Sequence, residues 1–379
     1  MTTTINNEHK KLNVPNLRFP EFQGEWEKKS LGEIGDSFIG LTYRPADVVS
    51  EGGLIVFRSS NIQNGCMDYK DIVRVNKNVK EKLITKKDDL LVCARNGSAR
   101  LIGKNAILHE TDANQTFGAF MMVFRSDKNH FVHQLLNTRR YSSQVSENLG
   151  ARINQITSSD LSSFEFFFPK GNNEMNKISA LLDLLDERIA TQNKIIDKLQ
   201  SLIKGISQKI VRFNKPNVRL SECLVCKSST LQESDVYEQG TYPVYGANGI
   251  VGYLDNYNTE GEAVYIIKDG SGVGTVSYVT GKCSATGTLN TLQAKEGYFL
   301  QYLYYLLKVF NFEPYKTGMA IPHIYFKDYG KAKVFCPSYT EQLRYARLLS
   351  AIDNKLSIEQ NIITELRIQK QYLLRQMFI

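Results

Sequence analysis

The first third of the chain contains two polar runs whose side chain types can contact nucleic acid. Their members are Arg58, Ser59, Ser60, Asn61 and Asn64 in the first run, and Arg95, Asn96, Ser98 and Arg100 in the second. Arginine can present a fork of donors to guanine O6 and N7 or to a phosphate, and asparagine can form a bidentate pair with adenine. The alternative is a solvated loop in which Asn and Ser cap backbone groups. We predict these residues as DNA contacts.

A comparable set lies in the second half of the chain, beside glycines that permit tight hairpins or close backbone approach. Its members are Tyr245, Asn248, Lys268, Asp269 and Ser271. Structural turns would explain these glycines equally well. A good bidentate base contact gives about 1 to 3 kcal/mol of discrimination against the wrong base, whereas a phosphate contact affects all sequences alike. Substitution can therefore separate the two roles.

An internal repeat indicates the elements that must hold these residues. At a constant offset of 168 residues, Gly150 pairs with Gly318, Ile153 with Ile321, Ile156 with Ile324, Asp160 with Asp328 and Pro169 with Pro337. The same offset aligns a strand at 120–124 with 288–292, and each is followed by a predicted helix. Two similar frames with different inserts suggest one scaffold with separate targets. A tandem duplication without divided function is the alternative.

Each half of the repeat ends in a long helix with apolar residues at alternating spacings of three and four. The first stripe is Leu182, Leu185, Ile189, Ile196, Leu199, Ile203, Ile206 and Ile210, and the second is Leu349, Ile352, Leu356, Ile363, Leu366, Leu373 and Met377. This spacing is typical of a coiled-coil seam. We expect the two helices to pack on each other in antiparallel fashion. Two unrelated amphipathic helices in separate cores are the alternative.

Polar residues interrupt both seams. Gln192 and Glu359 occupy equivalent positions and Lys370 adds a charge, which weakens the seam and can set its register. The stretch from Leu182 to Ile210 should extend about 43 Å at about 1.5 Å per residue. This length is a little more than one turn of B-DNA, which is roughly 34 to 36 Å.

Composition is consistent with a folded protein of two domains. The chain has 379 residues, of which 42% are hydrophobic, and a formal net charge of +8, which suits a polyanionic partner. No stretch has the length of a signal peptide core or a membrane span, so we expect a cytoplasmic protein without a membrane partner. Six cysteines in so long a chain favour reduced, packed thiols.

Enzymatic interpretations find little support in the sequence. The glycine-rich run at 269–274 lacks the Gly-Lys-Ser/Thr of a phosphate-binding loop. Cys223 and Cys226 form a C-x-x-C that could bind zinc or act in redox chemistry, but no second close Cys/His pair accompanies them. In the repeat, Cys223 and Cys336 fall opposite apolar residues, which predicts packed positions. We predict no catalytic residue and no metal site.

Several further segments resemble type I restriction-modification specificity subunits. They are Pro-Asn-Leu-Arg-Phe-Pro-Glu-Phe-Gln-Gly-Glu-Trp-Glu at 15–27, Phe-Arg-Ser-Ser-Asn-Ile-Gln-Asn-Gly at 57–65, the run at 89–98, Tyr-Pro-Val-Tyr-Gly-Ala-Asn-Gly-Ile-Val-Gly-Tyr at 242–253 and Lys-Asp-Gly-Ser-Gly-Val-Gly at 268–274. Together with the order domain, helix, domain, helix, they make the chain similar to this family over essentially its whole length.

The resemblance implies a non-catalytic subunit of a type I restriction enzyme and DNA adenine methyltransferase complex. Each domain would read one half of a bipartite, asymmetric site on double-stranded DNA, and the helices would act as the spacer. Two methyltransferase subunits and the restriction/translocase subunits would be its partners. S-adenosylmethionine, ATP and magnesium would belong to these partners, with no cofactor in this chain. A coiled-coil adaptor that joins proteins without reading DNA is the alternative.

We therefore expect an α+β protein with two globular target-recognition domains, a pair of long antiparallel coiled-coil helices and an internal pseudo-twofold repeat. The predicted parts are an N-terminal segment at 1–29, the first recognition domain at 30–170, the central helix at 171–214, the second recognition domain at 215–338 and the C-terminal helix at 339–379.

Overall fold

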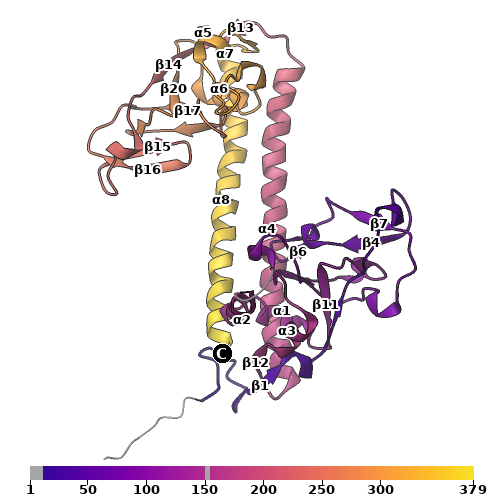
Figure 1. The fold of residues 1–379 in the computed structure, drawn as a ribbon. Coiled ribbons are helices and arrows are strands. Elements are labelled where there is room, and N and C mark those ends of the chain that lie inside the picture. Colours follow the sequence, from indigo (N-terminus) through magenta and orange to yellow (C-terminus); the bar gives the residue numbers. More distant parts are fainter. Residues whose placement is uncertain (1–11, 150–153) are drawn as a thin grey trace, which may run out of the picture. The chain divides into compact units, whose positions relative to one another are not determined.

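The computed structural model describes residues 12–149 and 154–379, so the repeat positions Gly150 and Ile153 lie outside the described residues. The chain forms two compact units. The first comprises the chain up to Gln192 together with Ile362–Ile379, and the second comprises Asn193–Asn361. Each unit combines small sheets, short helices and parts of two long helices, as the α+β prediction required (Figure 1).

The first unit is built on two four-stranded sheets. One has the order β2 (Asp36–Ile39), β11 (Met121–Arg125), β8 (Leu90–Cys93), β9 (Asn105–Ile107), and is antiparallel throughout. The other has the order β10 (Thr116–Phe117), β4 (Leu54–Phe57), β7 (Val73–Val75), β3 (Val48–Val49), with β10 parallel to β4. Two antiparallel pairs complete the unit: β1 (Glu27–Ser30) with β12 (Glu165–Phe168), and β5 (Ile62–Gln63) with β6 (Cys66–Met67).

Short helices and the ends of the long helices cover these sheets. They are α1 (Asn129–Leu135), α2 (Arg139–Leu149), α3 (Ser158–Ser163), the beginning of α4 (Asn172–Arg212) and the end of α8 (Tyr339–Met377). Trp26, Phe131, Phe168 and Phe378 form the aromatic centre of this core, with ring centroids 5.3 to 6.3 Å apart. The C-terminal end of α8 therefore belongs to the core of the first unit.

The second unit repeats this plan with fewer residues. Its antiparallel sheet has the order β14 (Leu224–Ser228), β20 (Leu289–Ala294), β17 (Ala263–Ile267), β18 (Val276–Val279). A second sheet has the order β16 (Gly249–Leu254), β15 (Tyr242–Gly246), β19 (Ser284–Ala285), and β13 (Val218–Arg219) pairs with β21 (Lys333–Val334). The short helices are α5 (Leu220–Cys223), α6 (Leu300–Leu307) and α7 (Phe326–Tyr329).

The sheets confirm the internal repeat. The strand order β2-β11-β8-β9 of the first unit corresponds element by element to β14-β20-β17-β18 of the second. The parallel pair β10 and β4 likewise corresponds to the parallel pair β19 and β15. Each domain is also closed at its base by an antiparallel pair, β1 with β12 and β13 with β21.

The two long helices contribute to the same hydrophobic core in each unit. In the first unit Leu182 of α4 packs in the same cluster as Met377 of α8. In the second unit Ile203 of α4 packs in the same cluster as Leu349 and Leu356 of α8. The beginning of α4 therefore accompanies the end of α8 and the reverse, so the helices run antiparallel. All residues of the two predicted seams are buried or half-buried, and the alternative of separate cores is wrong.

Candidate nucleic-acid interface

In the first unit the two predicted polar runs meet. Arg58 to Asn61 follow strand β4 and include the 3-10 turn Ser59–Asn61, whereas Arg95 to Ser98 follow strand β8. The Nδ2 of Asn96 donates a hydrogen bond of 2.9 Å to the Oγ of Ser59 across 37 residues of sequence. The Oδ1 of Asn96 also accepts from the backbone N–H of Ser98 at 3.0 Å. The second run is thus held in a turn beside the first.

An exposed aromatic side chain lies next to this turn. The guanidinium carbon of Arg95 lies 5.4 Å from the centroid of the Phe120 ring, and Phe120 is 59% exposed. Both residues are at the rim of β8 and β11. A guanidinium above an aromatic ring forms a flat surface of the kind on which a base can stack. The sequence analysis missed Phe120, because an exposed phenylalanine has the same local pattern as a buried one.

A groove of about 840 Å³ runs beside the first of the two loops and the exposed Phe120. Its lining includes Tyr43, Arg58, Ser59 and Phe120. Arg58 is ion-paired with Asp71 at 2.6 Å, so its charge is partly balanced before any ligand arrives. The groove therefore offers aromatic and hydrogen-bonding groups more than net positive charge.

Asn61 corrects one sequence prediction. Its side chain is 0% exposed, and its Oδ1 accepts from the backbone N–H of Arg58 at 2.8 Å. Its Nδ2 donates to the carbonyl oxygens of Asp68 and Asp71 at 3.0 and 2.9 Å. The amide has no face free for a base. Asn61 therefore fixes the turn, and the structural alternative holds at this position.

The remaining predicted residues of the first unit lie near the surface. Asn64 is exposed in the turn between β5 and β6, with a φ of 53°. Ser60 is half-buried, and Ser98 and Arg100 are exposed at the 3-10 turn Ala99–Leu101. These side chains are accessible to a ligand.

In the second unit the predicted residues fall on two turns. Asn248 is exposed at the turn of the β15–β16 hairpin, and Tyr245 is half-buried with its ring 5.7 Å from that of Tyr265. Lys268, Asp269 and Ser271 follow β17 and are half-buried or exposed. The carboxylate of Asp269 lies 3.7 Å from the Nδ1 of His323, a residue that the sequence analysis did not select. Asp269 therefore faces the neighbouring loop as well as solvent.

The loop after β8 is fastened by a set of backbone hydrogen bonds. The N–H of Ile156 donates to the carbonyl oxygen of Ala94 at 2.9 Å, and the N–H of Asn96 donates to that of Asn154 at 3.4 Å. The N–H groups of Ala94 and Arg95 both donate to the carbonyl oxygen of Phe120 at 3.0 Å. We call this arrangement, a loop after a central strand tied to two distant segments, the clip.

The same clip occurs in the second unit. The N–H of Ile324 donates to the carbonyl oxygen of Lys268 at 2.9 Å, that of Gly270 to Pro322 at 2.9 Å, and that of Lys268 to Thr288 at 3.0 Å. Ile324, Pro322 and Thr288 are each 168 residues beyond Ile156, Asn154 and Phe120. The predicted loops Arg95–Asn96 and Lys268–Asp269 are therefore equivalent elements of the two domains.

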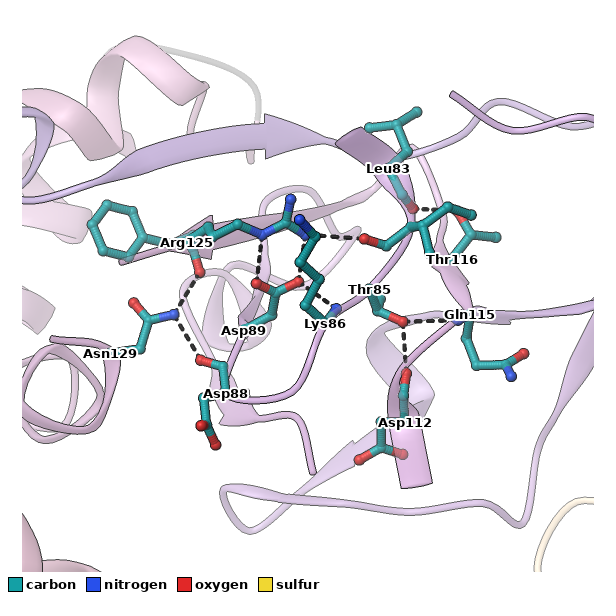
Figure 2. A network of polar contacts seen from close by, with 12 residues as sticks. Leu83, Thr85, Lys86, Asp88, Asp89, Asp112, Gln115, Thr116, Arg125 and Asn129 are labelled. Carbon is teal, nitrogen blue, oxygen red and sulfur yellow. Dashed lines mark hydrogen bonds and ion pairs between the residues drawn. The ribbon is translucent and has the colours of Figure 1, made fainter. Parts of the chain in front are cut away.

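An ion pair positions the strand that carries the first clip (Figure 2). Arg125, at the end of β11, donates from Nε and Nη2 to the two carboxylate oxygens of Asp89 at 2.7 and 2.6 Å, just before β8 begins. The backbone N–H of Lys86 also donates to Asp89 at 2.8 Å. The hydrogen bond to Asp89 raises the pKa of Arg125. A bidentate pair of this kind fixes orientation as well as distance, so β8 enters the clip in one register.

A second polar network joins the first recognition domain to the long helices. His130 of α1 contacts Asp183 of α4 at 2.6 Å, and the Nε2 of Gln134 donates to Asp183 and Asp186 at 2.9 and 3.0 Å. The Nζ of Lys370, from α8, donates to Asp186 at 2.5 Å. The hydrogen bond with Asp183 raises the pKa of His130. All these contacts lie within the first unit.

Four of the six cysteines are buried, whereas Cys226 is half-buried and Cys66 is exposed. Cys223 and Cys336 are buried in the core of the second unit, which confirms their predicted packed positions. Burial raises the pKa of the Cys226 thiol to about 11. Within residues 12–149 and 154–379, no group of three or more His, Cys, Asp or Glu side chains is placed to hold a metal ion. In this part of the chain no helix is long and apolar enough to span a bilayer either.

Comparisons with known proteins agree with this repeated architecture. The family model for the type I restriction modification DNA specificity domain matches twice, at residues 23–201 and 217–367. The type I restriction enzyme EcoKI specificity subunit of Escherichia coli K12 is 28% identical over 184 residues, or 46% of this chain and 36% of that relative. A putative type I specificity subunit of Mycoplasma genitalium is 24% identical over 252 residues, or 60% of this chain and 65% of that relative.

Both alignments span less than two thirds of the relative. The crystal structure of a type I restriction-modification S subunit from M. genitalium has the same fold, with a TM-score of 0.69 at 19% identity, covering 97% of this chain and 99% of that one.

Proposed function

Because the chain belongs to the family of type I restriction modification DNA specificity domains, we propose that it is the sequence-reading subunit of a type I restriction-modification complex. Each domain reads one half of a bipartite, asymmetric site on double-stranded DNA. The two long helices set the spacing between the half-sites and dock methyltransferase subunits. The restriction/translocase subunits join the same complex, which acts in the cytoplasm.

The clip is the observation that carries this proposal. Two loops selected independently for their base-reading side chains are held by equivalent backbone bonds on equivalent strands. In the first domain the clip presents Arg95 and in the second it presents Lys268 and Asp269. The two domains share the backbone hydrogen bonds of the clip but carry different side chains on it. Because side chains that contact base edges determine which sequence is read, the same frame supports two readers with different targets.

Exposed apolar residues on the helices support methyltransferase docking. In the first unit Leu181 and Leu184 of α4 and Ile368 and Tyr372 of α8 remain exposed outside the shared core. Apolar positions that the unit itself leaves in solvent are typical of a surface that another protein covers. We assign the methyl donor S-adenosylmethionine, ATP and magnesium to partner subunits, and no catalytic step to this chain.

Methylome sequencing tests the proposal. Cells that carry this chain and the methyltransferase encoded with it should methylate a split, asymmetric motif. Arg95→Ala should change only one half of that motif and Asn248→Ala only the other. Lys87 is a matched control for Arg95, since it is an exposed cation at the opposite end of β8. Lys87→Ala should leave the motif unchanged.

The outcome also separates the adaptor alternative from the proposal. A continuous motif, or a motif in which both halves respond to Arg95→Ala, would contradict the assignment of one half-site to each domain. A chain that assembles with the methyltransferase but binds no duplex at any salt concentration would favour the adaptor, because phosphate-driven binding strengthens as salt is lowered.

A further inference from the structure

The second unit carries an apolar side chain at full exposure on the tip of a short hairpin. The hairpin spans 317–323, where Thr317 and His323 exchange backbone hydrogen bonds of 2.9 and 2.8 Å. At its tip Met319 is 106% exposed, and Ile321 beside it is 60% exposed. The unit therefore leaves two large apolar side chains in solvent at one point, and Met319 is the more exposed of the two.

The turn of the hairpin requires a glycine. Gly318 has a φ of 87°, and a Cβ at this position would lie 2.4 Å from the carbonyl oxygen of Ile321. Only glycine fits this turn without displacement of the backbone. The backbone turn that carries Met319 is thus set by Gly318 together with the hydrogen bonds between Thr317 and His323.

The hairpin is also part of the clip. Its residue Pro322 accepts from the N–H of Gly270, and the next residue after the hairpin, Ile324, donates to Lys268, both at 2.9 Å. The isolated bridge between Asp269 and His323 lies between these two bonds. Met319 therefore lies on the segment that is bonded to the loop carrying Lys268 and Asp269, the predicted base-reading residues of this domain.

We propose that Met319 inserts between adjacent base pairs of the half-site read by the second domain and unstacks one base step. This inference rests on the proposed DNA-reading function. Apolar wedges such as methionine, isoleucine and phenylalanine unstack base steps in proteins that deform DNA. An unbranched thioether on a fixed turn suits this role, because the backbone sets the entry point and the side chain adapts to the opened step.

The first domain differs at this position. Residue 151, which is 168 residues before Met319, is alanine. Its side chain carries one carbon and cannot reach between stacked bases. The unstacking should therefore be confined to one of the two half-sites.

The test uses the full chain and duplexes of its methylated motif with 2-aminopurine placed at each adenine or adjacent position in turn. This base fluoresces more strongly when it is unstacked. The expected result is a rise on binding at one step of the second half-site and at none of the first. Met319→Ala should abolish the rise and weaken specific binding about tenfold to a hundredfold, the effect of losing one buried apolar side chain. Met319→Leu should retain both.

Each other result overturns the inference in a recognisable way. If the wild-type chain shows no site-selective binding, the proposed function and this inference both fail. Selective binding without a Met319-dependent rise overturns the inference alone. If replacing thymine with uracil in the duplex lowers the affinity of the wild-type chain as much as Met319→Ala does, Met319 contacts a thymine methyl group instead. Weaker assembly of Met319→Ala with the methyltransferase at unchanged DNA affinity would assign the tip to a protein partner. Circular dichroism of the variant establishes that the fold is intact.

Discussion

His133 should make the first unit sensitive to mild acid. Its imidazole is buried on α1, with Nδ1 2.8 Å from the Oδ1 of Asn105 and Nε2 3.9 Å from the carboxylate of Asp186. The pKa of His133 is lowered to about 4, mainly because the imidazole is buried and in part because of the nearby charge of Lys370, while the carboxylates of Asp186 and Asp183 oppose the shift. The native unit therefore holds this imidazole neutral.

The sign and size of the effect follow from this pKa. The unfolded chain should take up the proton near the ordinary pKa of about 6.5, whereas the native state takes it up only near 4. Stability must then fall as pH drops through this window. From about pH 7 to pH 5 the loss is about 2 kcal/mol, and it approaches about 3 kcal/mol below pH 4. His130 acts in the opposite direction, because its pKa is raised: its contribution is present at low pH and is lost as pH rises.

A single tryptophan allows this to be measured for the first unit alone. Trp26 is the only tryptophan of the chain and is 2% exposed in the same core as Phe131 of α1. Urea unfolding followed by Trp26 fluorescence should give a stability difference between wild type and His133→Gln that changes by about 2 kcal/mol between pH 7 and pH 5.

Parallel pH profiles for the two proteins would refute the reasoning. So would an NMR titration in which the imidazole of His133 accepts its proton above pH 6, since the native state would then not resist protonation.

Three further outcomes are expected. Lys370→Met should destabilise the first unit by about 2 kcal/mol, because Asp186 loses its ammonium partner in a largely buried site; the urea midpoint from tryptophan fluorescence measures this. Asn61→Ala should cost about 1 to 3 kcal/mol through its lost backbone hydrogen bonds and leave the methylated motif unchanged, since its side chain is buried. Arg95→Ala should relax selection at one base pair by about 1 to 3 kcal/mol if the contact is bidentate, and competition binding with single-base variants of the motif would detect it.

The architecture could be predicted from the sequence because its signals are periodic. A seam at alternating spacings of three and four residues depends only on helix geometry, and every seam residue is buried or half-buried. The constant offset between Ile156 and Ile324 likewise reflects equivalent positions in the two clips. Such patterns persist while the sequences of the two halves diverge, because they depend only on which side of a helix or strand is buried.

The interface could be predicted only in part. Arginine and asparagine in turns are the correct residue types, but Asn61 and Asn64 look alike in sequence, and only the loop at 68–71 buries the first of them. Phe120 and Met319 carry no local sign of exposure. Their placement depends on backbone bonds between segments that are distant in the chain, and composition does not reveal such bonds.

The two halves of the repeat share the backbone hydrogen bonds of the clip but differ in the side-chain contacts that join each domain to the long helices. At the positions of His133 and Asp183, the second unit has Gln301 and Ser350, joined by a hydrogen bond of 3.3 Å. The hydroxyl of Tyr305 also donates to Asp353, the counterpart of Asp186, at 3.2 Å, so a helix carboxylate joins domain and helix in both units but through different partner residues. The clip, in contrast, consists of backbone groups, whose hydrogen bonds do not depend on the side chains. A scaffold fixed by its backbone allows side chains on the reading loops to change without loss of position. Divergence of the two targets therefore requires no change in the fold.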